Sequence, residues 1–341
     1  MRLRTFYVVL IPLMLLAALA GVAIGTTPLS PLTVAQAVAH HLVPDGLVSL
    51  TPITGVEDTI VWLVRFPRVL VAATVGAGLA VAGAVMQSLF RNPLAEPGLA
   101  GVGPGAVLGA VIAFVTGVAG KSVVALPLSA AAAAFGALLV VYAIATRTGR
   151  MSTQALLLAG LAVGAFCTAI ASFLLSINIV TWQVAQDIVF WMMGGLESRT
   201  WAHVWLSAPF VVCGLVLTML HARTLDVMPL GEYKAATLGV DVGAARRVLL
   251  VTSALLAGAS IAVAGLVGFV GLVVPHAVRA VVGSRHRVLV PACGASGATF
   301  LMLCDLIART VRPPAEVRLG VVTAMVGAPL FVALLLRSTR A

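Results

Sequence analysis

The sequence predicts an all-α membrane protein with about ten transmembrane helices, organised as one domain over residues 1–341. Hydrophobic residues make up 61% of the chain and charged residues only 9%, against roughly 25% charged residues in a water-soluble domain. The charges form short clusters between long apolar runs, so the surface between the clusters must face lipid. These runs show no alternation in polarity, which argues against a transmembrane β-barrel.

The apolar runs divide the chain into ten predicted spans, an even number that places both termini on one side of the membrane. The first run, from about Phe6 to Gly25, follows Arg2 and Arg4 in the manner of a signal peptide. Because it is near 20 residues long and many spans follow it, we expect it to be retained. The remaining spans are predicted to begin near Val69, Gly98, Val123, Thr153, His203, Val248, Gly268, Arg287 and Arg318.

Three polar segments separate groups of these spans. Residues from about 26 to 65, which contain four prolines, and from about 176 to 202, which are rich in Trp and Gly, are predicted to be periplasmic. Residues from about 223 to 247 form the longest polar insert, which we expect to be cytoplasmic. The 33 glycines indicate that the helices pack through close backbone approach.

The distribution of Lys and Arg indicates the orientation of the chain. With both termini in the cytoplasm, about two thirds of the 21 basic residues fall on the cytoplasmic side, as the positive-inside rule requires. The basic residues that depart from this rule are predicted on the outer side of the membrane, and most of them gather in two places. They are Arg65, Arg68, Lys121, Arg199, Arg309, Arg312 and Arg318.

No catalytic motif occurs, so we expect no enzymatic activity. The nearest approach to a phosphate-binding loop, residues 115–122, has Val115 in place of the first glycine and is interpreted as a short turn. The four cysteines lie singly in apolar runs, which predicts neither a metal site nor a disulfide. The net charge of +10 comes without a basic run interleaved with aromatics, which argues against nucleic acid as a partner.

A block rich in proline and glycine extends from Arg65 to Gly105. Such a composition interrupts helices, which a membrane tolerates only where protein or a water-filled cavity covers the exposed backbone groups. The block therefore lines a path through the protein or packs beside one, or it forms a tight turn between spans. Its candidate path residues are Met86, Gln87, Asn92, Pro93, Gly101, Gly103 and Gly105.

Together with this block, ordered motifs in the second half of the chain resemble those of the iron-chelate, haem and cobalamin uptake permeases of bacterial ABC importers. The matching motifs are Leu230-Gly231-Glu232, Leu238-Gly239-Val240, Gly268 to His276, His286-Arg287, Asp305, Ala308-Arg309, Glu316 and Gly327-Ala328-Pro329. The resemblance implies a permease subunit of the bacterial inner membrane that binds no permanent cofactor.

The resemblance also implies which partners the chain has. Two permeases would pair as a homodimer, and two cytoplasmic subunits would hydrolyse ATP while docked on the insert between the sixth and seventh spans. On residue types alone, an ordinary solvated loop is the alternative for this insert. The matching positions lie between Asp226 and Val240 and include Leu230, Gly231, Glu232, Lys234 and Gly239.

A periplasmic substrate-binding protein is the third implied partner. In the family it docks acidic residues on arginines of the outer face, and the matching residues here are Arg65, Arg68 and Arg309. Arginine pairs a carboxylate in bidentate geometry, which suits such a contact. Arg312 and Arg318 extend the patch, and Arg318 departs from the proline usual in the family.

The cargo rests on two histidines, His276 and His286. Imidazole ligates haem iron, and matching histidines are implicated in haem-specific members of the family, so haem is the preferred cargo, followed by a ferric siderophore and then cobalamin. A structural role for both histidines is the alternative.

An ion-coupled secondary transporter is disfavoured because Asp187 and Asp305 are the acidic residues near spans and both are placed toward outer ends. A purely structural scaffold would not explain the external arginines.

Overall fold

The computed structural model describes residues 2–25, 27, 29–42, 55–147, 153–177 and 181–338, and every regular element in these residues is a helix. Seven of the described helices are long and apolar enough to cross a membrane. They are α1 (Arg2–Ala23), α4 (Phe66–Phe90), α6 (Ala125–Arg147), α7 (Thr153–Ile177), α9 (Trp201–Leu220), α12 (Val242–Ala264) and α14 (His286–Thr310). With three further apolar helices, α5 (Val102–Val115), α13 (Val270–Val282) and α15 (Leu319–Ser338), they confirm the prediction of about ten transmembrane helices.

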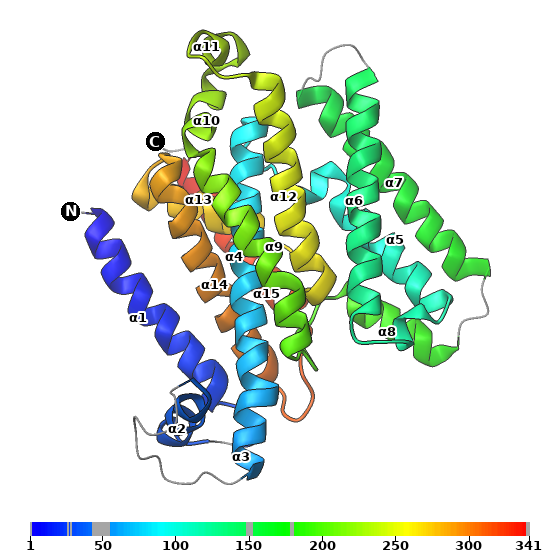
Figure 1. Ribbon diagram of the computed structural model, residues 1–341, viewed down its shortest axis with the longest axis vertical. Coiled ribbons are helices and arrows are strands. Elements are labelled where there is room, and N and C mark those ends of the chain that lie inside the picture. Colours follow the sequence, from blue (N-terminus) through cyan, green and yellow to red (C-terminus); the bar gives the residue numbers. More distant parts are fainter. Residues whose placement is uncertain are drawn as a thin grey trace.

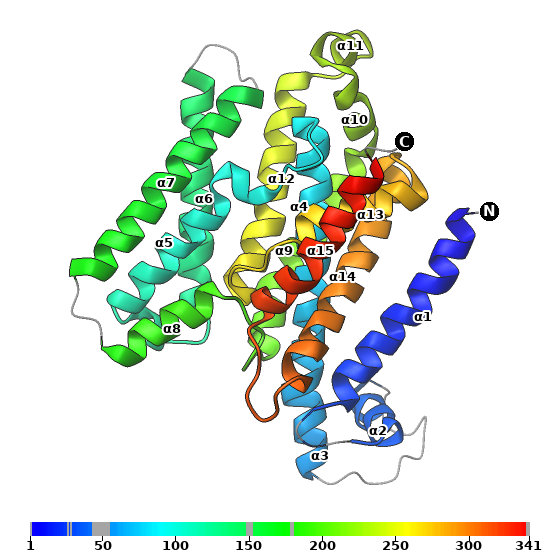
Figure 2. The same ribbon diagram turned by 180° about the vertical axis from the view of Figure 1, so that it is seen from behind.

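In the described residues, five short α-helices lie between the spans. Helices α2 (Pro31–Leu42) and α3 (Gly55–Thr59) occupy one end of the molecule, and α10 (Ala222–Val227) and α11 (Glu232–Thr237) occupy the other (Figure 1). Both termini lie toward the end that carries α10 and α11. Helix α8 (Trp182–Met192) lies beside α5 in the group formed by α5, α6 and α7 (Figure 2).

Helix α4 is the centre of the fold, because α9, α12, α13 and α14 all pack against it. Two pairs of glycines allow these helices to approach closely. A Cβ added to Gly83 would lie 1.8 Å from the carbonyl oxygen of Gly271 in α13, and one added to Gly76 would lie 2.2 Å from that of Gly297 in α14. At these two crossings the helices pack closely through glycine, as the sequence predicts.

The boundaries of two spans differ from the sequence-based expectation. The helix that contains α4 is continuous from Gly55, so the last part of the segment predicted outside the membrane is helical. A wide π-helical turn, Ile60–Arg65, precedes Pro67 and accommodates the missing N–H of that proline. Helix α12 begins at Val242 rather than near Val248, because the Asp241 side chain accepts a hydrogen bond from Ala244 N (2.9 Å) and caps it.

The proline- and glycine-rich block breaks the chain only in its second half, which corrects the expectation for the first half. Residues from Phe66 to Phe90 are helical throughout. The helix then ends at Arg91, which has a left-handed backbone, and the chain turns through a short 3₁₀ segment, Pro97–Ala100, before α5 begins at Val102. Residues 116–124 form the predicted short turn between α5 and α6.

Candidate functional site

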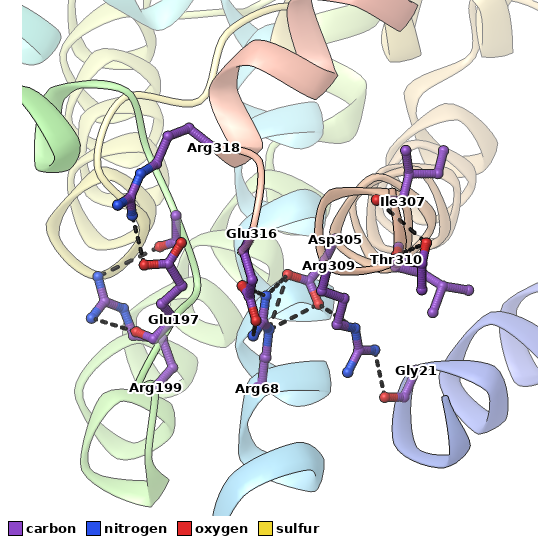
Figure 3. Close-up of polar contacts among 12 residues, drawn as sticks. Gly21, Arg68, Glu197, Arg199, Asp305, Ile307, Arg309, Thr310, Glu316 and Arg318 are labelled. Carbon is purple, nitrogen blue, oxygen red and sulfur yellow. Dashed lines mark hydrogen bonds and ion pairs between the residues drawn. The ribbon is translucent and has the colours of Figure 1, made fainter. Parts of the chain in front are cut away.

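Two arginines, Arg65 directly before α4 and Arg309 in the last turn of α14, hold the end of α1. Arg65 donates hydrogen bonds to the carbonyl oxygens of Val22 (3.0 Å), Ala23 (2.7 Å) and Thr27. Arg309 donates to the carbonyl of Gly21 (Figure 3). These carbonyls include the last ones of α1, which lack partners within the helix. Cationic groups at a helix C-terminus also interact favourably with its dipole. The two guanidinium groups therefore cap α1 and fix it to the bundle.

Arg68 binds two carboxylates at the same end of the molecule. Its guanidinium lies 2.8 Å from Asp305 Oδ1 and 2.7 Å from Glu316 Oε2, and it makes further hydrogen bonds to both carboxylates (Figure 3). Arg309 Nε lies 3.6 Å from the other oxygen of Asp305. Asp305 is only 1% exposed, so its charge depends on these partners. The cluster joins α4, α14 and the turn that leads into α15.

Three of the predicted docking residues lie in this arrangement, and their role in docking a partner stays a prediction. Arg65, Arg68 and Arg309 are all buried, and their guanidinium groups contact carbonyls and carboxylates of the same chain. Charges on the outer side of a membrane protein can serve internal helix caps as well as partners, and the sequence does not distinguish the two. Arg312, on the turn between α14 and α15, is the exposed member of the predicted patch.

A second charged group, not predicted as a unit, lines a cavity of about 430 Å³ between α5, α8 and the start of α15. Arg318 lies 2.6 Å from Glu197 and 3.9 Å above the centre of the Phe190 ring (Figure 3). Arg199 donates to the carbonyl of Val263 at the end of α12. Burial lowers the pKa of Arg199 to about 10, against the opposing effect of the Glu197 carboxylate.

The signal for this second group was present in the sequence. Arg199 and Arg318 both break the positive-inside bias, and Arg199 lies within the Trp- and Gly-rich segment. What the sequence could not show is that the backbone between α8 and α9 passes alongside the start of α15. There, Leu319 N donates to Gly194 O (3.1 Å) and Gly320 N donates to Met193 O (3.0 Å).

At the opposite end, three side chains form a continuous hydrogen-bonded chain across α4, α10 and α14. His286 Nδ1 lies 2.6 Å from Asp226 Oδ1, and its Nε2 lies 2.6 Å from Ser88 Oγ. His286 is 3% exposed, and both of its ring nitrogens have hydrogen-bond partners inside the protein. Asp226 also accepts the backbone N–H of His286 (2.8 Å), which connects the polar insert directly to the first turn of α14.

The candidate path residues fall into two groups. Gln87, Asn92, Pro93 and His286 line one cavity of about 330 Å³ beside the insert, where the Gln87 amide donates to Leu272 O (3.1 Å). The others lie elsewhere in the fold. Met86 is fully buried in α4, Gly101 and Gly103 lie at the start of α5, Gly105 packs against α6, and His276 is half-buried on α13.

The predicted coupling residues lie on and beside α11, at the tip of the insert. Gly231 (φ 113°) and Gly239 (φ 82°) flank this helix with backbone conformations that favour glycine. Leu230 is 55% exposed, and Leu238 (62%), from the matching motif, and Tyr233 (82%), which the sequence did not single out, are exposed beside it. Lys234 is also exposed, whereas the side chain of Glu232 lies outside the described residues.

Comparison with known proteins agrees with this architecture. The model of the FecCD transport family matches residues 13–337. A cobalamin import system permease protein, BtuC, of Halobacterium salinarum is 43% identical over 82% of this chain and 75% of its own length. The vitamin B12 import system permease protein BtuC of Klebsiella pneumoniae is 41% identical over 82% of each chain.

A solved structure described as an inward-facing conformation of a metal-chelate type ABC transporter has the same fold. It superposes with a TM-score of 0.85 and 30% identity, covering 98% of this chain and 99% of that one. The family match, the curated relatives and this structure all span most of the chain. The chain therefore belongs to the FecCD transport family and is a permease subunit of an ABC importer.

Proposed function

We propose that this permease carries cobalamin, or a closely related corrinoid, across the inner membrane. The observation that supports this cargo is the set of relatives at 41% to 43% identity, which are named as cobalamin and vitamin B12 import permeases. Cobalamin was the last of the three cargoes in the sequence-based order. Cobalamin is now the preferred cargo because of these relatives and because the two histidines do not favour haem.

The sequence favoured haem because two histidines could serve as iron ligands. His286 does not fit this role, because its ring nitrogens already contact Asp226 and Ser88 beside the insert. His276 lies half-buried on α13. A single histidine without a second axial ligand gives no preference for haem over other chelates.

We further propose that the end carrying α10 and α11 faces the cytoplasm and binds the ATP-hydrolysing subunits, one for each permease of a homodimer. The exposed side chains of Leu230, Tyr233 and Leu238 support this proposal. Apolar and aromatic side chains gathered at the tip of a polar insert are typical of a surface that a partner covers. The termini would then also be cytoplasmic, as the distribution of basic residues indicates.

The periplasmic binding protein would dock on the opposite end. Of the predicted patch, exposed Arg312 is the residue available to a carboxylate of that partner. The charged cavity with Arg318 and Glu197 lies near the same end and would border the entry of the path. In this proposal the substrate passes along the interface between two copies of the permease.

The cargo is tested by uptake into proteoliposomes that contain the permease with its ATPase and receive its binding protein. We expect ATP-dependent uptake of labelled cobalamin that excess haem does not inhibit. The variant His276→Ala should transport cobalamin at the wild-type rate, because no histidine is needed as a ligand. Uptake of labelled haem without uptake of cobalamin would overturn the proposed cargo.

A further inference from the structure

His40, His41 and Asp58 place three metal-binding side chains together at the end of the molecule that carries α2 and α3 (Figure 1). One ligand atom from each residue lies within 4.8 Å of the other two. The histidines lie in the last turn of α2, and Asp58 lies in α3. Both histidines are exposed and Asp58 is half-buried, so an ion can reach them from solvent.

The central member of this cluster is held in place before any ion binds. His41 Nε2 lies 3.0 and 3.1 Å from the two oxygens of Asp58, so the two ligand groups already face each other. The His41 ring also stacks on Trp62 at 4.2 Å, with an angle of 7° between the planes. The Trp62 ring is packed in turn against the rings of Phe66 (5.3 Å between centroids) and Trp201 (4.9 Å).

We propose that His40, His41 and Asp58 form a binding site for a divalent transition-metal ion, for which Zn²⁺ is the best match. Two imidazole nitrogens and one carboxylate oxygen are ligands that Zn²⁺ takes in proteins. With metal–ligand distances of about 2.0–2.2 Å, tetrahedral ligand atoms are roughly 3.5 Å apart, so small side-chain rotations close the site. Three protein ligands leave the fourth position to water, which makes the ion exchangeable.

The ion would act as a clamp between α2 and the first turns of the long helix that contains α4. Without an ion, the pair His41–Asp58 and the stacking of His41 on Trp62 join these two elements. A bound ion replaces the His41–Asp58 contact with three bonds and brings His40 into the connection. Since an ion that binds only the folded arrangement stabilises it, Zn²⁺ should raise the unfolding temperature of the permease.

The site lies at the end on which the binding protein is proposed to dock, but it uses none of the residues that the proposed function assigns to transport. The insert with α10 and α11 lies at the other end, and none of the three residues belongs to the Arg68 cluster. The sequence-based expectation of no metal site came from cysteine spacing. It missed this cluster because His41 and Asp58 are 17 positions apart and the fold brings them together.

The site is tested by Zn²⁺ titration of the purified full-length permease, carrying a tag without histidine and freed of metal with a chelator. We expect one ion per chain by calorimetry. The variants His40→Gln and Asp58→Asn should each weaken affinity about tenfold or more. His41→Phe keeps a ring over Trp62 and should weaken it as strongly. His221→Gln, at the other end of α9, is the matched control and should bind as wild type.

A second measurement needs no variant. Zn²⁺ should protect His40 and His41 from acylation by diethyl pyrocarbonate, as read by mass spectrometry of the wild-type protein, while the reactivity of His221 stays unchanged. Equal modification of His40 and His41 with and without Zn²⁺ would overturn the proposal. The same conclusion would follow if the Asp58→Asn and His40→Gln proteins bound Zn²⁺ as tightly as wild type.

Discussion

At the residue scale, Arg65, Arg68 and Arg309 serve the fold of the permease itself. Arg65 and Arg309 cap the carbonyls of α1, and Arg68 binds both Asp305 and Glu316. Asp305 is nearly inaccessible, and its permanent partner Arg68 makes it unsuited to carrying a coupling ion. This pairing weakens the alternative of an ion-coupled transporter, which needs ionisable groups that change partners.

We predict that Arg68→Ala strongly destabilises the permease. Removing one partner of a buried ion pair costs about 3–5 kcal/mol, because it leaves the other charge buried and unpaired. Arg312→Ala, at an exposed position on the adjacent turn, should change stability by no more than about 0.5 kcal/mol. Thermal unfolding of the purified variants in detergent measures the difference. Equal unfolding temperatures for Arg68→Ala and wild type would contradict the structural role.

The sequence predicted where these charges lie but not what they bind. Hydropathy and the positive-inside rule place Arg65, Arg68 and Arg309 at the outer side without any knowledge of the fold. Their partners are the end of α1, 43 positions before Arg65, and Asp305, 237 positions after Arg68. Such pairs depend on how the helices pack, which the pattern along one helix does not contain. The resemblance therefore could not show that these arginines also bind carbonyls and carboxylates of their own chain.

At the scale of the helices, α4 depends on glycine for its contacts with α13 and α14. The backbones at Gly83 and Gly271 approach so closely that any side chain at Gly83 would overlap a carbonyl oxygen. Most helix positions were predictable, since hydrophobic runs of the right length exist for each span. The exceptions, at Gly55 and Val242, arise where a helix continues through polar residues beyond the apolar run, which hydropathy does not detect.

Gly83→Ala should therefore destabilise the bundle by more than an ordinary overpacking substitution, which costs typically about 1–3 kcal/mol. Gly258→Ala in α12 is the matched control, because its Cβ would enter open space. Alanine is favoured over glycine inside a helix by about 0.5–1 kcal/mol, so the control should be unchanged or slightly more stable. Denaturation followed by circular dichroism distinguishes the two. Similar stability for both variants would show that α4 and α13 do not meet at Gly83.

At the scale of the whole molecule, the two ends of the permease differ in structure. One end carries the exposed tip of the insert, connected through Asp226 and His286 to α14 and through Ser88 to α4. A movement of the insert would therefore be transmitted to two long helices through buried hydrogen bonds. The sequence indicated the insert by its length and polarity. The connection between Asp226 and His286 was not predictable, because these residues are 60 positions apart.

The central claim, a permease driven through this insert by a separate ATPase, is tested most directly by ATP hydrolysis in nanodiscs containing the permease and its ATPase. Liganded binding protein should stimulate hydrolysis with wild-type permease. The double variant Tyr233→Glu, Leu238→Glu should abolish this stimulation, since it places charge on the docking surface, whereas Lys121→Gln at the turn between α5 and α6 should retain it. Full stimulation with the double variant would contradict the account.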